Sequence, residues 1–145
     1  MTIKIKVEEL IHKYPDGTQA LKGANIDVRE GEFLAVLGAN GSGKTTLLKH
    51  FNGLLKPVSG SVTLDNKALS DFKSGEVFRK VGMVFQDPND QLIAPTVEED
   101  IAFGPTNLGL GYDEIMSRVN TALELVKMKE FAKKAIHALS YGQSK

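Results

Sequence analysis

The feature that most constrains the fold is a glycine-rich run, Gly38-Ala39-Asn40-Gly41-Ser42-Gly43-Lys44-Thr45. It directly follows a continuous apolar run, 33–37, of the kind found in strands buried on both faces. It precedes residues 45–55, which have the composition of a helix ending before Pro57. A strand, a glycine loop and a helix in this order predict an α/β protein whose loop amides surround a polyphosphate.

The loop also carries the side chains that a nucleotide site needs. Lys44 supplies a point charge for the β- and γ-phosphates, and the hydroxyl of Thr45 is suited to Mg²⁺. The alternative is a glycine-rich turn that matches by chance, which the flanking strand and helix make less favourable. The candidate nucleotide-binding residues here are Gly38, Ala39, Asn40, Gly41, Ser42, Gly43, Lys44, Thr45 and Thr46.

Composition fits one globular core and excludes several other classes. Of the 145 residues 41% are hydrophobic, and 18 basic residues balance 18 acidic ones, so no nucleic-acid partner is expected. There is no cysteine for a disulfide or a thiolate metal site, and His12, His50 and His137 are too scattered to suggest a ligand set. The N-terminus lacks the apolar core of a secretory signal, and the longest apolar runs are too short to span a membrane.

The first part of the chain has the pattern of a sheet. Residues 3–7 and 26–28 alternate apolar and polar side chains on either side of the turn 14–17, which predicts antiparallel strands. Two further strands are predicted at 61–65 and 81–86.

From about residue 89 onward the pattern is helical. Thr96-Val97-Glu98-Glu99 matches a capping box, which predicts a helix start. Residues 113–128 carry one apolar stripe at helical spacing. The stripe contains Ile115, Val119, Ala122 or Leu123, and Val126.

Four features, taken in order, identify a family. They are Tyr14, the glycine loop, the glutamine that ends Val84-Phe85-Gln86, and the pentapeptide Leu139-Ser140-Tyr141-Gly142-Gln143. This order resembles the ATP-binding subunits of ABC transporters over essentially the whole chain. Residues 85–92, 94–97 and 103–110 are similar to the energy-coupling-factor and cobalt-importer branch of that family.

The resemblance implies roles for two side chains outside the loop. Tyr14 would stack on adenine, for which its flat ring is suited. Gln86 would reach Mg²⁺ and the attacking water, as the catalytic candidate, and would couple the site to a membrane subunit. The alternatives are an ordinary hairpin tyrosine and a solvated glutamine.

The pentapeptide has a physical and a family interpretation. Ser140-Tyr141-Gly142-Gln143 matches a capping box and predicts a helix start. In the family, that helix start faces the γ-phosphate bound by a partner subunit, so a head-to-tail dimer is implied. Tyr141 replaces the more usual glycine. The alternative is a helix cap without a ligand.

The implied fold is an incomplete ABC ATPase core of the P-loop NTPase class. Residues 1–88 would form an antiparallel β subdomain and the first part of the core, 89–139 a helical subdomain, and 140–145 the signature motif. After the signature, the family continues with a second Mg²⁺-site Asp, a catalytic Glu and a switch His, none of which can be placed here. We therefore expect a chain truncated after the signature, without hydrolysis. We also expect it to be unstable, with 33–37 and 81–85 exposed for lack of neighbouring strands.

Three hypotheses remain. The first is an ATP- and Mg²⁺-binding subunit of an importer for cobalt, another transition metal ion or a vitamin, peripheral on the cytoplasmic face through membrane subunits. The second is a non-hydrolysing nucleotide-binding fragment or interaction module. The third is an unrelated P-loop NTPase whose pentapeptide matches by accident.

Overall fold

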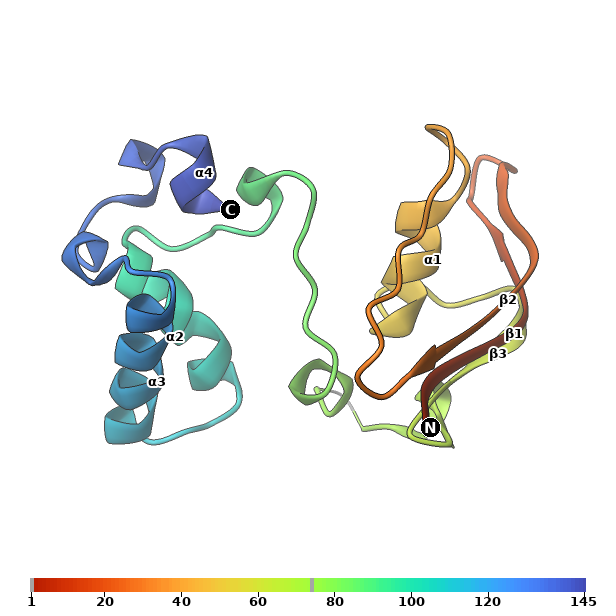
Figure 1. Ribbon diagram of the computed structural model, residues 1–145, viewed down its shortest axis with the longest axis horizontal. Coiled ribbons are helices and arrows are strands. Elements are labelled where there is room, and N and C mark those ends of the chain that lie inside the picture. The colour runs from red at the N-terminus through yellow and green to blue at the C-terminus, as the bar shows by residue number, and fades with distance from the viewer. Residues whose placement is uncertain (1, 74) are drawn as a thin grey trace. The chain divides into compact units, whose positions relative to one another are not determined.

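The computed structural model describes residues 2–73 and 75–145, which divide into two compact units. The first unit is Met1–Met83 and the second is Val84–Lys145. The ribbon of each unit can be followed in Figure 1.

The first unit contains an antiparallel sheet. Its long strands β1 (Ile3–Lys13) and β2 (Gln19–Arg29) form a hairpin, and β3 (Ser59–Leu64) pairs with the other edge of β1. A short strand, β4 (Lys67–Ala68), completes the order β2-β1-β3-β4. The antiparallel strands predicted from alternation are confirmed, and the hairpin strands are longer than predicted.

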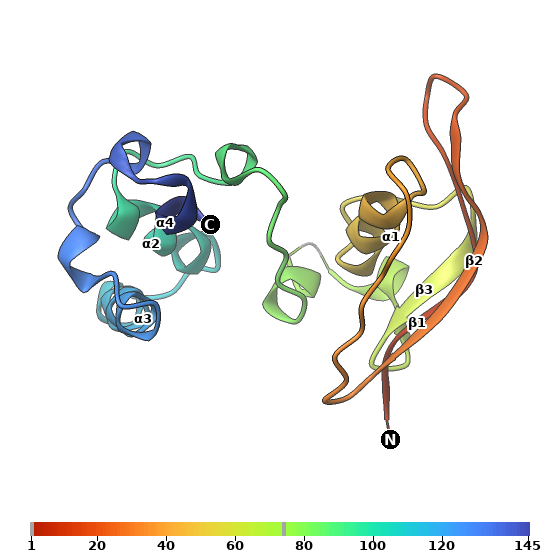
Figure 2. The same cartoon turned by 45° about the horizontal axis from the view of Figure 1, so that its top comes forward.

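Helix α1 (Lys44–Phe51) lies beside this sheet in both views (Figures 1 and 2). Its buried face packs on the sheet and forms the core of the unit. The predicted helix extended to residue 55, but α1 ends at Phe51 because Gly53 takes a left-handed φ of 75°. The buried apolar residues of this core are Val7, Leu10, Leu21, Leu47, Phe51 and Val62.

Two predicted strands are not formed. Residues 33–37 and 81–86 have no strand partner among the described residues, and the prediction of buried strands there is wrong. Phe33 is 97% exposed and Leu37 is 89% exposed, as expected for a strand sequence without neighbours. Val81, by contrast, packs against the core of the first unit. The expected instability stays a prediction.

The second unit is helical. Helices α2 (Val97–Asn107) and α3 (Tyr112–Leu125) pack together around the buried side chains of Val97, Val119 and Leu123. Figure 2 shows α2 and α3 with the short helix α4 (Tyr141–Ser144). Short 3-10 helices occur in both units, at Leu69–Asp71, Val77–Arg79, Pro88–Asp90, Lys129–Phe131 and Ile136–Ala138.

The local signals in this unit are largely confirmed. The Glu99 carboxylate accepts hydrogen bonds from the Thr96 amide at 3.1 Å and the Thr96 hydroxyl at 2.7 Å, within the predicted capping box. The stripe on α3 is confirmed at Val119 and Leu123, which are 1% exposed. The prediction that Val126 belongs to the stripe is wrong, because α3 ends at Leu125 and Val126 is 62% exposed.

Across the described parts of the chain, 2–73 and 75–145, no helix has the length and apolar character needed to cross a bilayer.

Candidate nucleotide-binding site

The glycine loop turns directly into the first residue of α1. Gly43 forms the N-cap with a φ of 91°, a left-handed conformation that favours glycine. A Cβ atom at this position would lie 2.6 Å from the carbonyl oxygen of Ala20 on β2. The loop therefore meets the sheet at a point where a side chain would clash. Among the residues that the structure describes, no side-chain cap is formed at the start of α1.

The ammonium group of Lys44 is surrounded by neutral oxygen atoms of the loop. It donates to the carbonyl oxygens of Gly38 and Ala39, both at 2.8 Å, and to the Ser42 hydroxyl at 3.5 Å. Within residues 2–73 and 75–145, Lys44 forms no ion pair. A cation with neutral partners beside a helix start is a suitable site for an anion.

Two threonines follow the lysine, and they face different surroundings. Thr45 is exposed, whereas Thr46 is 6% exposed and its hydroxyl lies 2.9 Å from the Tyr14 hydroxyl. Tyr14 follows the last residue of β1 and is 36% exposed. The structure thus brings Tyr14, which is distant in sequence, to the helix that begins at the loop.

Two histidines lie behind Tyr14. The His12 ring makes edge-to-face contacts with the Tyr14 ring at 4.7 Å and the His50 ring at 4.8 Å, between centroids. His50 Nδ1 lies 2.7 Å from the Thr46 carbonyl oxygen, and His12 Nδ1 lies 3.3 Å from that of Lys56. A carbonyl only accepts, so each Nδ1 carries the proton. Each Nε2 then presents a buried lone pair, without a hydrogen-bond partner among the described residues.

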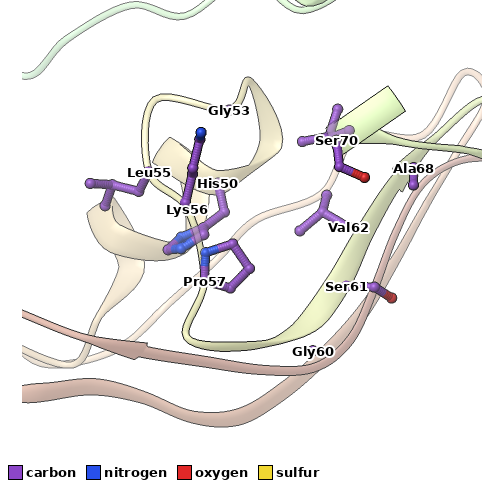
Figure 3. A pocket seen from close by; sticks show the side chains of 11 residues that line it. His50, Gly53, Leu55, Lys56, Pro57, Gly60, Ser61, Val62, Ala68 and Ser70 are labelled. Carbon is purple, nitrogen blue, oxygen red and sulfur yellow. The ribbon is translucent and has the colours of Figure 1, made fainter. Parts of the chain in front are cut away.

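Burial lowers the pKa of His50 below its ordinary value, and the nearby His12 lowers it further. The hydrogen bond to the Thr46 carbonyl and the nearby backbone of Lys56 raise the pKa of His50 and so act in the opposite direction. His50 also lines a pocket of about 420 Å³ together with Leu55 and Pro57 (Figure 3). These surroundings favour the neutral imidazole.

The sequence analysis assigned no role to these histidines, although their spacing from Tyr14 and Thr46 is a signal that could have identified them. His12 lies two residues before Tyr14, and alternate residues of a strand share a face. His50 lies four residues after Thr46, and residues at that spacing share a face of a helix. A pattern search that stops at the loop omits both.

The remaining predicted site residues lie in the second unit. The Gln86 carbonyl accepts hydrogen bonds from the Tyr141 hydroxyl at 3.3 Å and from the Lys145 ammonium at 2.5 Å. The side chain of Gln86 is exposed. Contacts within this unit therefore bring the backbone of Gln86 to the pentapeptide, whereas Tyr14 and residues 38–46 meet in the first unit.

The pentapeptide forms the helix start that its sequence predicts. Ser140 caps α4 through its hydroxyl, which accepts from the Gln143 amide at 3.3 Å. Gln143 completes the capping box, since its side-chain oxygen accepts from the Ser140 amide at 3.0 Å. Tyr141 and Gly142 are exposed in the first turn. The predicted capping box is confirmed, and the predicted ligand role stays a prediction.

The candidate metal-binding groups are single oxygen donors. Among the described residues, no group of three or more His, Cys, Asp or Glu side chains forms a metal site. The exposed Thr45 hydroxyl and the Gln86 side-chain amide are oxygen donors of the type that Mg²⁺ accepts. Because each of these residues is a single donor in its own unit, a hard cation bound at either one would take most of its ligands from water and phosphate.

Comparisons with known proteins agree on one family. The model described as "ABC transporter" matches residues 21–145. The chain is 52% identical, over its full length, to the energy-coupling factor transporter ATP-binding protein EcfA of Methanosphaera stadtmanae, and covers 53% of that protein. It is 49% identical to EcfA of Methanocaldococcus jannaschii over 97% of the chain, which covers 51% of that relative. The chain thus spans about half the length of these curated relatives.

Solved structures share the fold. CbiO1 from Clostridium perfringens, described as part of the ABC transporter complex CbiONQ, has a TM-score of 0.81 and 44% identity. It is matched over 99% of this chain and 58% of its own. The ATP-binding cassette MJ0796, described as dimeric in a post-hydrolysis state with ADP and Pi, has a TM-score of 0.83 and 30% identity. That match covers 97% of this chain and 65% of the cassette.

Proposed function

The chain belongs to the ABC transporter family, and from that membership we propose that it forms the nucleotide-binding part of an energy-coupling-factor ATPase subunit. The observation that carries the proposal is the loop around Lys44, whose ammonium contacts neutral oxygens at 2.8 Å beside the start of α1. Polyphosphate oxygens are stronger acceptors for that ammonium than carbonyl oxygens, because they are charged. The loop amides and the helix start add further positive potential.

In the proposed site, residues of the first unit bind both the phosphates and the adenine of the nucleotide. Residues 38–46 surround the phosphates, with Lys44 directed to the β- and γ-phosphates. Tyr14 stacks on the adenine. Thr45 and Gln86 are the residues that would hold Mg²⁺, which neutralises phosphate charge when bound.

For the whole protein, we propose ATP hydrolysis by a head-to-tail dimer. Residues 140–143 would then face the γ-phosphate bound by the partner subunit, with the capped start of α4 supplying amide donors. The relatives support this assembly, because MJ0796 is described as dimeric and CbiO1 as part of a transporter complex.

We propose that Gln86 and its neighbours contact the membrane subunits. A pocket of about 440 Å³ in the second unit is lined by Pro88 and Leu92, which follow Gln86 closely in sequence, together with Ile136, His137 and Tyr141. A pocket of this size, with both apolar and polar lining, accepts a few side chains of a partner helix. The protein would be peripheral on the cytoplasmic face of the membrane. The proposed cargo is cobalt, another transition metal ion or a vitamin, chosen by the membrane subunits.

The test is ATP binding by the purified protein, measured by calorimetric titration. Lys44→Ala is expected to weaken binding about 10- to 100-fold, because a hydrogen bond to a charged group contributes about 1.5–3 kcal/mol. Lys22→Ala, at an exposed position on β2, is the matched control and should bind ATP like the unchanged protein. Equal ATP affinity of the two variants would refute the proposal.

A further inference from the structure

The four residues Tyr14, His12, His50 and Thr46 form a closed cycle of contacts. Two are ring contacts, from His12 to Tyr14 and from His12 to His50. The other two are hydrogen bonds that end on Thr46, one at its hydroxyl and one at its carbonyl oxygen. The cycle of contacts therefore joins the end of β1 to the first turns of α1.

We propose that His12 and His50 are positioning residues, which fix the aromatic ring of Tyr14 in the orientation that the nucleotide base requires. The inference rests on the proposed function, in which Tyr14 contacts the adenine. Neither histidine contacts the nucleotide itself in this proposal.

Tyr14 needs such support because of its place in the fold. It lies beyond the last paired residue of β1 and more than a third of its surface is exposed. A side chain in such a place loses rotamer freedom when a ligand stacks on it, and that loss weakens binding. Tyr14 is anchored at two points, by His12 at its ring and by Thr46 at its hydroxyl. Much of the ordering is therefore complete before a base arrives.

Histidine suits the supporting position better than an aliphatic side chain. The bonds from Nδ1 to the carbonyls of Thr46 and Lys56 fix each imidazole plane, and through it the edge-to-face contact. His50 is 1% exposed and His12 is 7% exposed, so both rings are buried. A leucine would fill the space but would leave the orientation of the Tyr14 ring unspecified.

The experiment compares two ligands of the purified protein, ATP and inorganic tripolyphosphate, by competition against a fluorescent nucleotide. His12→Ala is expected to weaken ATP binding about three- to tenfold, the range of one lost aromatic contact. Tripolyphosphate affinity should change by less than about twofold, because Lys44 and the loop remain. His12→Phe keeps a ring in place and should recover most of the ATP affinity. Lys13→Ala, the exposed neighbour on β1, is the control and should change neither affinity.

A loss of ATP and tripolyphosphate affinity in equal proportion would overturn the proposal, since it would indicate a general structural role. If His12→Ala unfolds, Tyr14→Phe replaces it, because this variant keeps the ring and removes only the hydroxyl that contacts Thr46, so ATP affinity should fall while tripolyphosphate affinity stays unchanged. Tyr14→Ala distinguishes a failure of the proposed adenine contact from a failure of the proposed positioning role. If Tyr14→Ala weakens the binding of ATP but not of tripolyphosphate, and His12→Ala weakens neither, the positioning role alone is rejected. No base-specific loss in Tyr14→Ala rejects the adenine contact and the positioning role together.

Discussion

Replacing Gly43 with alanine is expected to lower the free energy of unfolding by about 2–5 kcal/mol. A left-handed φ, here 91°, costs a residue with a Cβ about 1–2 kcal/mol. The new Cβ would also lie 2.6 Å from the Ala20 carbonyl oxygen and 3.1 Å from Leu21 Cδ2. Ala20 lies within β2, between Gln19 and Leu21, which both pair with β1, and relieving such overpacking against backbone costs about 1–3 kcal/mol more.

The assay is urea denaturation followed by circular dichroism, and the same loop provides the control. Gly41 has a φ of 79°, but a Cβ there would meet no atom within 4 Å. Gly41→Ala should therefore lower the free energy of unfolding only by the cost of the left-handed φ, about 1–2 kcal/mol. The difference between the two variants measures the contact of the loop with β2. Equal losses would refute the reasoning, because they would mean that the loop does not press on the sheet at Gly43.

Two further predictions concern packing and pH. Leu123→Ala should lower the free energy of unfolding by about 2–5 kcal/mol in chemical denaturation, because Leu123 is 1% exposed in the core of the second unit; Leu125→Ala, 78% exposed on the same helix, should change it by less than about 0.5 kcal/mol. The folded-state pKa of His50 lies below its ordinary value near 6.5, so the unfolded state takes up the proton first as pH falls. The stability due to the neutral imidazole is thus full above about pH 6.5 and is lost as pH falls from there towards the folded-state pKa. Thermal melts between pH 8 and pH 5 should show a smaller decrease for His50→Phe, and an identical decrease would contradict the prediction.

Local sequence signals predicted the elements whose stabilising partners lie close in the chain. The capping boxes at Thr96 and Ser140 formed because each is completed by a side chain three residues later. The hairpin of β1 and β2 formed around the turn 14–17, since alternation and turn residues specify it locally.

Elements that depend on distant partners were predicted less well. The run 33–37 has the composition of a strand, but a strand requires a neighbour for its backbone hydrogen bonds, and none of the described strands pairs with it. The contact of Tyr14 with Thr46 joins residues far apart in sequence, so no local pattern specifies it. No local pattern specifies the contact between the two histidines either, because they become buried together only when α1 packs on the sheet.

The order of the sheet has a consequence for how the site assembles. β1 pairs with both β2 and β3, and the loop and α1 lie in the segment between Arg29 and Ser59 that joins those two strands. The hairpin closes a short stretch of chain, whereas docking β3 on β1 closes a long one at a greater cost in chain entropy. A ligand that binds only the state in which β3 is docked on β1 stabilises that state, and docking of β3 in turn favours binding of the ligand. Nucleotide bound at the loop should therefore slow hydrogen exchange at the amides of β3, although β3 contributes no residue to the proposed site.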